Sequence, residues 1–137
     1  MHHQQVALNY MRFNDSFALF MEQGVGKTLP TLFRILELYK QSKIRNCLVV
    51  APIVVIGSWQ SDIELFDKED QVLLNSCITT INYERVWQRV KGKDKLKPRD
   101  EIDKVWDCIV LDEAHNIKNR TSNRSQVLFE LSLNAKY

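Results

Sequence analysis

Short apolar runs alternate with segments of helical periodicity along the 137 residues of the chain. We expect strands at 17–21, 47–51, 77–81 and 106–112. Apart from Asp107 and Asp112 in the last run, the residues of these runs are apolar or β-branched, as in strands that are buried on both faces. Strands that alternate with helical patterns predict βαβ units. The pattern therefore predicts an α/β fold with a mainly parallel sheet and helices on both faces.

Helices are expected between and after these strands. The first follows the glycines at 24 and 26 and ends near Ser42. Its apolar positions have the spacing i, i+3, i+4, i+7 of one helix face: Leu32, Ile35, Leu36 and Tyr39. A second helix is expected to begin near Ser58, with Trp59, Ile63 and Phe66 on one side. Further helices are expected within 82–90 and 126–133.

Two segments lack a clear periodic pattern. Residues 90–104 are almost wholly polar, which favours a solvated loop and helix over a dedicated nucleic-acid patch. Residues 72–74 cannot form a separate parallel strand beside 77–81, because such neighbours need a crossover of about a dozen residues. Residues 72–74 are then either the start of the same strand or the remnant of a deleted element.

Composition narrows the class of protein. The net charge of +2 is too small to argue for a polyanionic partner by itself. Cys47, Cys77 and Cys108 have no CxxC spacing, so we expect buried free thiols and neither disulfides nor a zinc site. Because no apolar run approaches the roughly 20 residues of a membrane helix, we expect no membrane contact.

Each predicted strand runs into a polar or glycine-bearing cluster. These clusters read EQGVGKT, PIVVIGSW, NYE and EAH in chain order. In an open parallel sheet, the ligand crevice lies outside the carboxyl ends of the strands. We therefore expect the four clusters to meet at one edge of the sheet.

The first cluster has the layout of a phosphate-binding loop. Gly24, Val25 and Gly26 would present backbone N–H groups to phosphate oxygens at the start of a helix. Lys27 would reach the β and γ phosphates of ATP, and Thr28 would place its hydroxyl on Mg²⁺. The full pattern GxxxxGK[ST] is not met, because methionine occupies position 21.

The last cluster supplies the acidic half of such a site. Asp112 and Glu113 follow the apolar run CIVL and lie 84 residues beyond Thr28 (112 − 28). Asp112 can hold Mg²⁺, and Glu113 can orient and deprotonate the attacking water. With Lys27, Glu113 is our candidate catalytic group.

Four stretches together carry a family resemblance: MEQGVGKT, LVVAP followed by Trp59, TINYE, and LDEAHNIKN. Their order resembles helicase superfamily 2 and, within it, the Swi/Snf-type DNA-translocating ATPases. The resemblance implies a three-layer, RecA-like P-loop lobe over 1–137 that stops before the third helicase motif. It also implies ATP and Mg²⁺ as ligands, duplex DNA as a partner, and a second RecA-like lobe that this chain lacks.

The resemblance assigns roles to further residues. Gln4 would recognise adenine, since its amide can serve both the donor and the acceptor edge of the base. His115 would link the nucleotide site to the rest of the motor, or would be a structural hydrogen-bonding group. Trp59 would belong to the core or contact DNA. Contacts to the DNA backbone would come from Pro52, Thr80, Asn82, Tyr83 and Lys118.

Two other functions fit parts of the pattern. One is a P-loop kinase or another NTPase with a small substrate, although no lid is evident and Arg34 and Arg45 are the only arginines between the P-loop and the second strand. The other is a free-standing module that binds nucleotide or a protein without catalysis. The expected compartment is the cytoplasm for a bacterial or phage protein, or the nucleus for a eukaryotic one.

Overall fold

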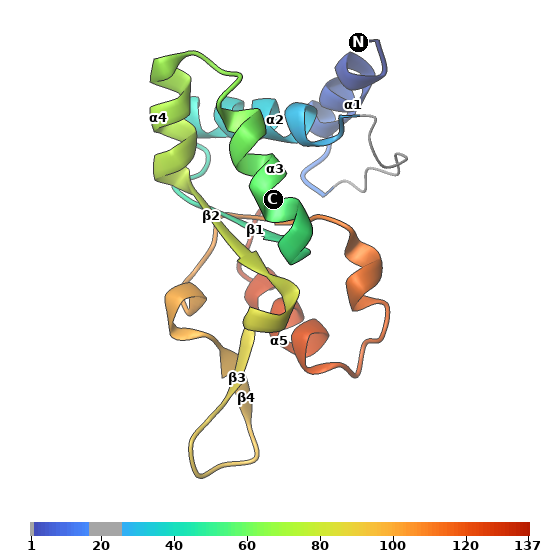
Figure 1. Cartoon of the computed structure of the whole chain (residues 1–137), viewed down its shortest axis with the longest axis vertical. Helices are drawn as coiled ribbons and strands as arrows, with labels where there is room; N and C mark the ends of the chain where they lie inside the picture. Colours follow the sequence, from blue (N-terminus) through green and yellow to red (C-terminus); the bar gives the residue numbers. More distant parts are fainter. Residues whose placement is uncertain (1, 17–25) are drawn as a thin grey trace.

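The computed structural model describes residues 2–16 and 26–137 (Figure 1). The strand expected at 17–21 lies outside the described residues, as do Gly24 and Val25. Within the described residues, helices lie on both sides of a central sheet (Figure 1). The α/β fold with layered helices is confirmed.

In the part of the chain that the structure describes, the sheet has three parallel strands in the order β2-β1-β5. These are β1 (Cys47–Ala51), β2 (Ile78–Asn82) and β5 (Cys108–Leu111). Ala51 pairs with Asn82, and Val50 pairs with Leu111. The three carboxyl ends therefore lie side by side, as the sequence predicted for the clusters that follow them.

Strand β1 contributes to two separate cores because its side chains alternate between the faces of the sheet. Cys47 and Val49 join the core covered by α2 (Thr28–Lys40), α3 (Ile53–Ile63) and α4 (Lys68–Cys77). Leu48 and Val50 join the core beneath α5 (Asn123–Ser132). All five residues of β1 are buried. Every position of this strand is apolar because neither face meets water.

Helix α3 starts earlier than predicted, at Ile53 instead of near Ser58. Pro52 precedes its first turn with an extended ψ of 146°, a position where a proline costs no helical hydrogen bond. Trp59 and Ile63 are buried as expected. The early start places two turns of helix between the end of β1 and Trp59.

Residues 72–74 belong to α4, so the interpretation as the start of the strand at 77–81 is wrong, and the remnant of a deleted element stays a prediction. The helix starts after Asp67, whose Oδ1 accepts a hydrogen bond from the Asp70 N–H at 2.9 Å. Helix α4 ends at Cys77, and β2 begins at the next residue, Ile78. Leu74 and Cys77 face the core.

The segment 82–104 also differs from the prediction. A 3-10 turn (Tyr83–Arg85) leads into β3 (Trp87–Arg89), which pairs with antiparallel β4 (Leu96–Pro98). A further 3-10 turn, Asp100–Ile102, follows, and the hairpin projects away from the body of the molecule (Figure 1). The buried side chains of Val86 and Ile102 anchor it to the second core. Because the tip of the hairpin is polar, its sequence predicted a solvated segment, and the burial of these two residues was not predicted.

Helix α1 (His2–Phe13) packs on α2 and buries Ala7, Leu8 and Met11. Arg12 of α1 forms an ion pair with Glu37 of α2, which lowers the pKa of that carboxyl group. Among the described helices, none is both long and apolar enough to cross a membrane. The three cysteines are buried free thiols, as predicted.

Candidate functional site

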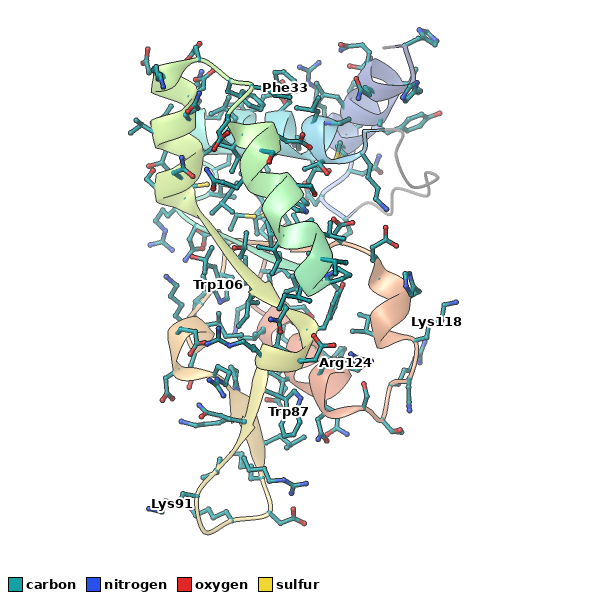
Figure 2. All side chains as sticks on the ribbon, viewed as in Figure 1. Phe33, Trp87, Lys91, Trp106, Lys118 and Arg124 are labelled. Carbon is teal, nitrogen blue, oxygen red and sulfur yellow. The ribbon has the colours of Figure 1, made fainter. Side chains whose placement is uncertain are left out.

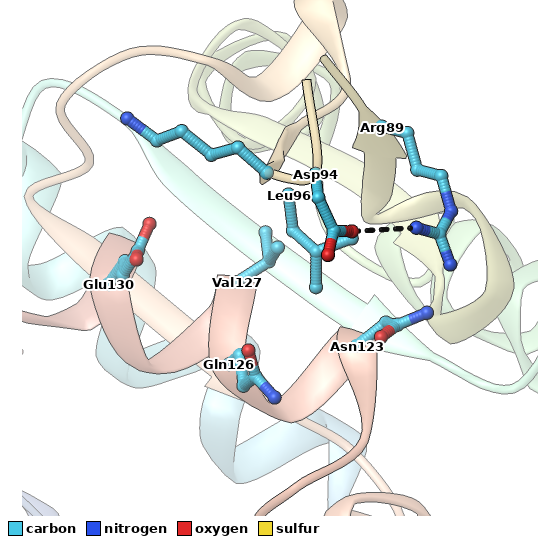
Figure 3. Close-up of a pocket in the computed structure, with 8 residues that line it drawn as sticks. Arg89, Asp94, Leu96, Asn123, Gln126, Val127 and Glu130 are labelled. Carbon is cyan, nitrogen blue, oxygen red and sulfur yellow. Dashed lines mark hydrogen bonds and ion pairs between the residues drawn. The ribbon is translucent and has the colours of Figure 1, made fainter. Parts of the chain in front are cut away.

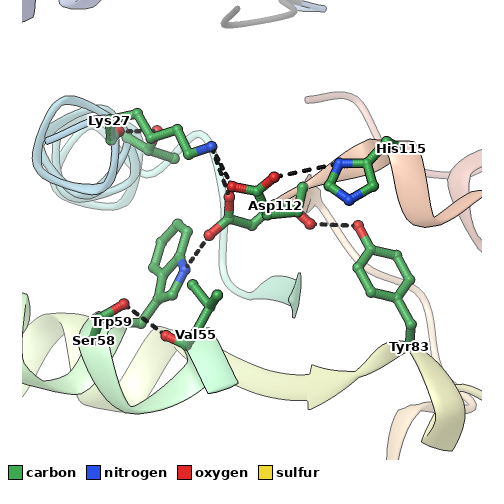
Figure 4. Close-up of polar contacts among 9 residues, drawn as sticks. Lys27, Val55, Ser58, Trp59, Tyr83, Asp112 and His115 are labelled. Carbon is green, nitrogen blue, oxygen red and sulfur yellow. Dashed lines mark hydrogen bonds and ion pairs between the residues drawn. The ribbon is translucent and has the colours of Figure 1, made fainter. Parts of the chain in front are cut away.

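Lys27 and Glu113 meet at the carboxyl edge of the sheet (Figure 4). Lys27 directly precedes α2, and Glu113 lies two residues beyond the end of β5. Lys27 Nζ lies 2.7 Å from Glu113 Oε1 and 3.7 Å from Asp112 Oδ1. The hydrogen bond to Glu113 is the largest cause of the raised pKa of Lys27, which keeps the ammonium group charged. One cation thus faces two neighbouring carboxylates.

Glu113 has a left-handed backbone conformation with φ 53° and ψ 52°. For a residue with a Cβ atom, this conformation costs about 1–2 kcal/mol. Strained backbone of this kind concentrates at functional sites, where the surrounding structure enforces it. Glu113 turns the chain from β5 into the 3-10 turn Ala114–Ile117.

Asp112 is held by three buried contacts. Its Oδ2 accepts a hydrogen bond from the indole Nε1 of Trp59 at 2.9 Å. Its backbone carbonyl accepts a hydrogen bond from the Tyr83 hydroxyl at 2.7 Å (Figure 4). Its N–H donates to the Val50 carbonyl at 2.8 Å. Only 7% of Asp112 is exposed. Its position is therefore set by three different segments of the chain.

Gln4 lies against the glycine loop. Its Nε2 donates to the carbonyl of Gly26 at 3.0 Å. Gly26 has φ 73°, and a Cβ atom there would lie 2.4 Å from Gln4 Nε2. The loop therefore needs glycine at this position both for its backbone conformation and to accommodate Gln4.

Thr28 begins α2, and its hydroxyl lies near the carboxylate of Asp62. Burial raises the pKa of Asp62, and the nearby hydroxyl opposes the rise. In the described ranges, no cluster of three or more His, Cys, Asp or Glu side chains is placed to hold a metal. A hydroxyl and one carboxylate, from Thr28 and Asp112, nevertheless fit Mg²⁺, which is commonly held by one or two carboxylates, phosphates and water.

His115 lies beside the acidic pair. Its Nδ1 is 3.3 Å from Glu113 Oε2, and 56% of its side chain is exposed. The imidazole thus contacts the proposed catalytic carboxylate and solvent together. Both roles considered for it, coupling and structural hydrogen bonding, remain predictions.

The residues predicted to contact DNA have different surroundings. Pro52 and Asn82 lie at neighbouring strand ends, because Ala51 and Asn82 are register partners. Thr80 is exposed, and Lys118 is exposed at the end of the 3-10 turn beyond β5 (Figure 2). Tyr83 is completely buried and its hydroxyl donates to the carbonyl of Asp112, so a DNA contact of Tyr83 stays a prediction for its backbone and not for its side chain.

Two hollows lie away from the Lys27–Glu113 pair. One of about 410 Å³ separates the hairpin from α5, and its lining includes Arg89, Asp94 and Glu130 (Figure 3). Its charges are mixed, and Arg89 is already paired with Asp94. The other, of about 290 Å³, lies between α3 and β2, and Thr80 and Asn82 line it. The second hollow therefore coincides with part of the predicted DNA-facing edge.

Sequence reasoning missed two polar contacts of α3. Trp59 was expected either in the core or against DNA, whereas it is a core residue that also donates to Asp112. Asp62, which lies near the Thr28 hydroxyl, was not singled out. The available signal was the i, i+3 spacing of these two residues, which places both on one face of the helix.

Comparison with known proteins agrees with this geometry. Residues 3–137 match the SNF2-related domain family. The SNF2 domain-containing protein ENL1 of Oryza sativa subsp. japonica is 26% identical over 131 residues, covering 80% of this chain and 13% of that protein. Chromodomain-helicase-DNA-binding protein 6 of Rattus norvegicus is 23% identical over 159 aligned positions, covering 98% of this chain and 6% of that protein.

Chromodomain-helicase-DNA-binding protein 8 of Homo sapiens is likewise 23% identical, with 98% of this chain and 6% of that protein covered. The chain thus spans about 6–13% of the length of the three relatives named here. The family match extends over Gln4, Lys27 and the acidic pair, and over every described strand. The chain belongs to the SNF2-related domain family.

Proposed function

We propose that this chain is the ATP-binding lobe of a Swi/Snf-type translocase that couples hydrolysis of Mg-ATP to movement along duplex DNA. The single observation that supports it best is the 2.7 Å contact between Lys27 Nζ and Glu113 Oε1, made by residues 86 positions apart. A lysine at a helix start and an acidic pair after a neighbouring strand form the two halves of a nucleotide triphosphatase site.

Each half would act on a different part of the reaction. The N–H groups at the start of α2 and the ammonium group of Lys27 would bind the β and γ phosphates. Glu113 would hold a water molecule in line with the γ-phosphorus and accept its proton as the oxygen attacks. The bond from the γ-phosphorus to the β–γ bridging oxygen breaks, and ADP departs.

Before this can occur, the ion pair between Lys27 and Glu113 must open. A phosphate would compete with Glu113 for the ammonium group, which would free the carboxylate to take a water molecule. When bound, Mg²⁺ would neutralise charge on the phosphates. Thr28 and Asp112 are the residues that would hold it.

DNA would pass along the carboxyl ends of β1 and β2. Pro52, Thr80 and Asn82 would face its phosphate backbone, with Lys118 as a further contact. Such contacts fix position without reading sequence. These side chains are apolar, polar and basic. Such a set suits contacts to the phosphate backbone of DNA rather than to the edges of its bases.

The lobe by itself should hydrolyse ATP poorly. In related phosphoryl transfers an arginine finger contributes about 10³- to 10⁵-fold in rate. We propose that the second RecA-like lobe of the full-length protein supplies this group and closes over the nucleotide.

The test uses the full-length gene product. We expect duplex DNA to stimulate its ATPase activity, Glu113→Gln to lower the stimulated rate by about 10²- to 10⁴-fold, and Lys27→Ala to remove the heat of Mg-ATP binding. Glu113→Gln should still bind Mg-ATP, because the groups proposed to bind the phosphates, Lys27 and the N–H groups at the start of α2, are unchanged.

Two results would contradict the proposal. ATPase activity that depends on Lys27 but ignores DNA would favour an NTPase acting on a small substrate. Absence of any lysine-dependent binding would favour a module that binds a partner without catalysis.

A further inference from the structure

Asp112 is the meeting point of two buried hydrogen bonds that come from the two segments proposed to face DNA. Trp59 reaches its carboxylate and Tyr83 reaches its backbone carbonyl. We propose that Trp59 and Tyr83 are positioning residues that transmit DNA contact to Asp112 and so couple DNA binding to Mg-ATP binding. This inference rests on the function proposed above.

The first connection runs through α3. The helix begins at Ile53, directly after Pro52, and carries Trp59 in its second turn. Trp59 is 2% exposed, so water does not compete for its N–H. A hydrogen bond from a buried donor to a carboxylate is both strong and directional. A displacement of the first turn of α3 would therefore change the hydrogen bond from Trp59 to Asp112 Oδ2.

The second connection is shorter. Tyr83 directly follows Asn82 at the end of β2, and its hydroxyl lies 2.7 Å from the Asp112 carbonyl. Burial raises the pKa of the Tyr83 hydroxyl, so the group remains a protonated donor. Because Tyr83 is held in the core, a shift of Asn82 must move this bond or strain the turn.

Trp106, a third buried aromatic residue, makes a hydrogen bond within its own segment and serves for comparison. The indole of Trp106 donates to the carbonyl of Ile102 at 2.9 Å, four residues away in its own segment. Trp59 and Tyr83 instead reach 53 and 29 residues along the chain to the same residue. Both bonds end at the proposed metal ligand. Tyr83 directly follows the proposed DNA contact Asn82, and Trp59 lies in the helix that begins after Pro52.

The experiment measures a coupling factor in the full-length protein. This factor is the ratio of duplex DNA affinities with and without the Mg-bound form of a non-hydrolysable ATP analogue, and linkage makes it equal to the reciprocal effect of DNA on the nucleotide. Typical coupling factors are about 5 to 150. We expect Trp59→Phe and Tyr83→Phe each to lower the factor on the order of fivefold.

Trp106→Phe is the matched control. It also removes one buried indole N–H, but from a bond that does not reach Asp112, so the factor should keep its wild-type value. A merely structural role would lower the melting temperature in all three variants and leave the factor unchanged. Tyr83→Phe deletes a single oxygen atom and carries the test if Trp59→Phe proves unstable.

A second measurement follows the indole N–H resonance of Trp59 after selective ¹⁵N labelling. Duplex DNA without nucleotide should shift it, whereas the Trp106 resonance should stay in place. Wild-type coupling factors in both Trp59→Phe and Tyr83→Phe would overturn the inference while leaving the proposed function intact. Failure of the wild-type protein to bind Mg-ATP would instead defeat the proposed function, and the inference with it.

Discussion

Position 26 requires glycine for two reasons, its backbone conformation and its contact with the Gln4 side chain. The φ of 73° disfavours any residue with a Cβ atom, and Gln4 occupies the space that a Cβ would take. Gln4 is also the residue proposed to recognise adenine. Gly26 and Gln4 therefore form one physical unit, although 22 residues separate them.

This unit predicts the effect of Gly26→Ala. The positive φ alone should cost about 1–2 kcal/mol in the free energy of unfolding, and displacement of Gln4 should add to that. Gly92→Ala is the matched control, because Gly92 has φ 75° and a Cβ atom there would meet nothing within 4 Å. Chemical denaturation of both variants should show the larger loss for Gly26→Ala.

A Gln4→Ala background isolates the clash. In this background the two alanine substitutions should differ by less than they do with Gln4 present. Equal losses for Gly26→Ala and Gly92→Ala in the native background would mean that Gln4 does not restrict the loop.

Single residues were predictable from the sequence where chemistry and position coincide in a short motif. Lys27 and Glu113 belong to such motifs, and the structure brings their side chains together. The bond from Trp59 to Asp112 was not predictable, because it depends on where α3 begins and on which turn of the helix faces β5. The burial of Tyr83 was missed for a similar reason, since a motif does not say which side of the sheet a side chain enters.

Among the elements, α1 is the one whose docking decides where Gln4 lies. It packs on α2 through a small apolar face and through the ion pair of Arg12 with Glu37. Since Arg12 is partly exposed, water screens this ion pair and its contribution to stability is small. The helix is therefore held mostly by its apolar contacts, and the ion pair adjusts its position.

Arg12→Ala should consequently weaken ATP binding by about two- to fourfold, in line with the small free energy of a partly exposed ion pair. GTP, which lacks the edge that Gln4 would recognise, should lose less affinity. Isothermal titration with both nucleotides measures this difference.

Arg45→Ala is the matched control, because it removes another exposed arginine that pairs with an aspartate, Asp107, away from α1. Equal affinities for ATP in Arg12→Ala and wild type would show that α1 keeps its position without the ion pair.

The type and bounds of an element were predicted best where its apolar pattern is long and clear. Strand β1 and helix α2 have patterns that only one structure satisfies, and both were predicted with nearly correct bounds. The hairpin β3–β4 was missed because its tip is polar and the fully buried residues at its base, Val86 and Ile102, lie outside its two short strands. Helix α4 was missed because its first turn is acidic and its buried face contains only Leu74 and Cys77, which is too few for a clear helical pattern.

Across the whole molecule, several buried groups respond to pH in the same direction. Burial raises the pKa of Cys77 to about 12 and raises that of Tyr83. A group whose pKa is higher in the folded state stabilises fully below its unfolded pKa and loses that contribution as the pH rises towards the folded value. For Cys77 this window runs from its ordinary value of 9.0 to about 12.

We therefore expect the free energy of unfolding to fall as the pH rises above 9.0, with a contribution from Cys77 of at most about 1.4 kcal/mol per pH unit. Cys77→Ala should show a flatter slope in urea titrations over this range. Leu74→Ala, on the same helix and 1% exposed, should lower stability without changing the slope. Parallel curves for wild type and Cys77→Ala would contradict the prediction.

Strand β1 gives the lobe a property that neither helical layer has alone. Val49 and Val50 are consecutive, yet they pack against opposite cores. Opening either layer exposes one side of this strand and removes support from the other. A probe attached to α2 and another attached to α5 should thus report one shared melting transition.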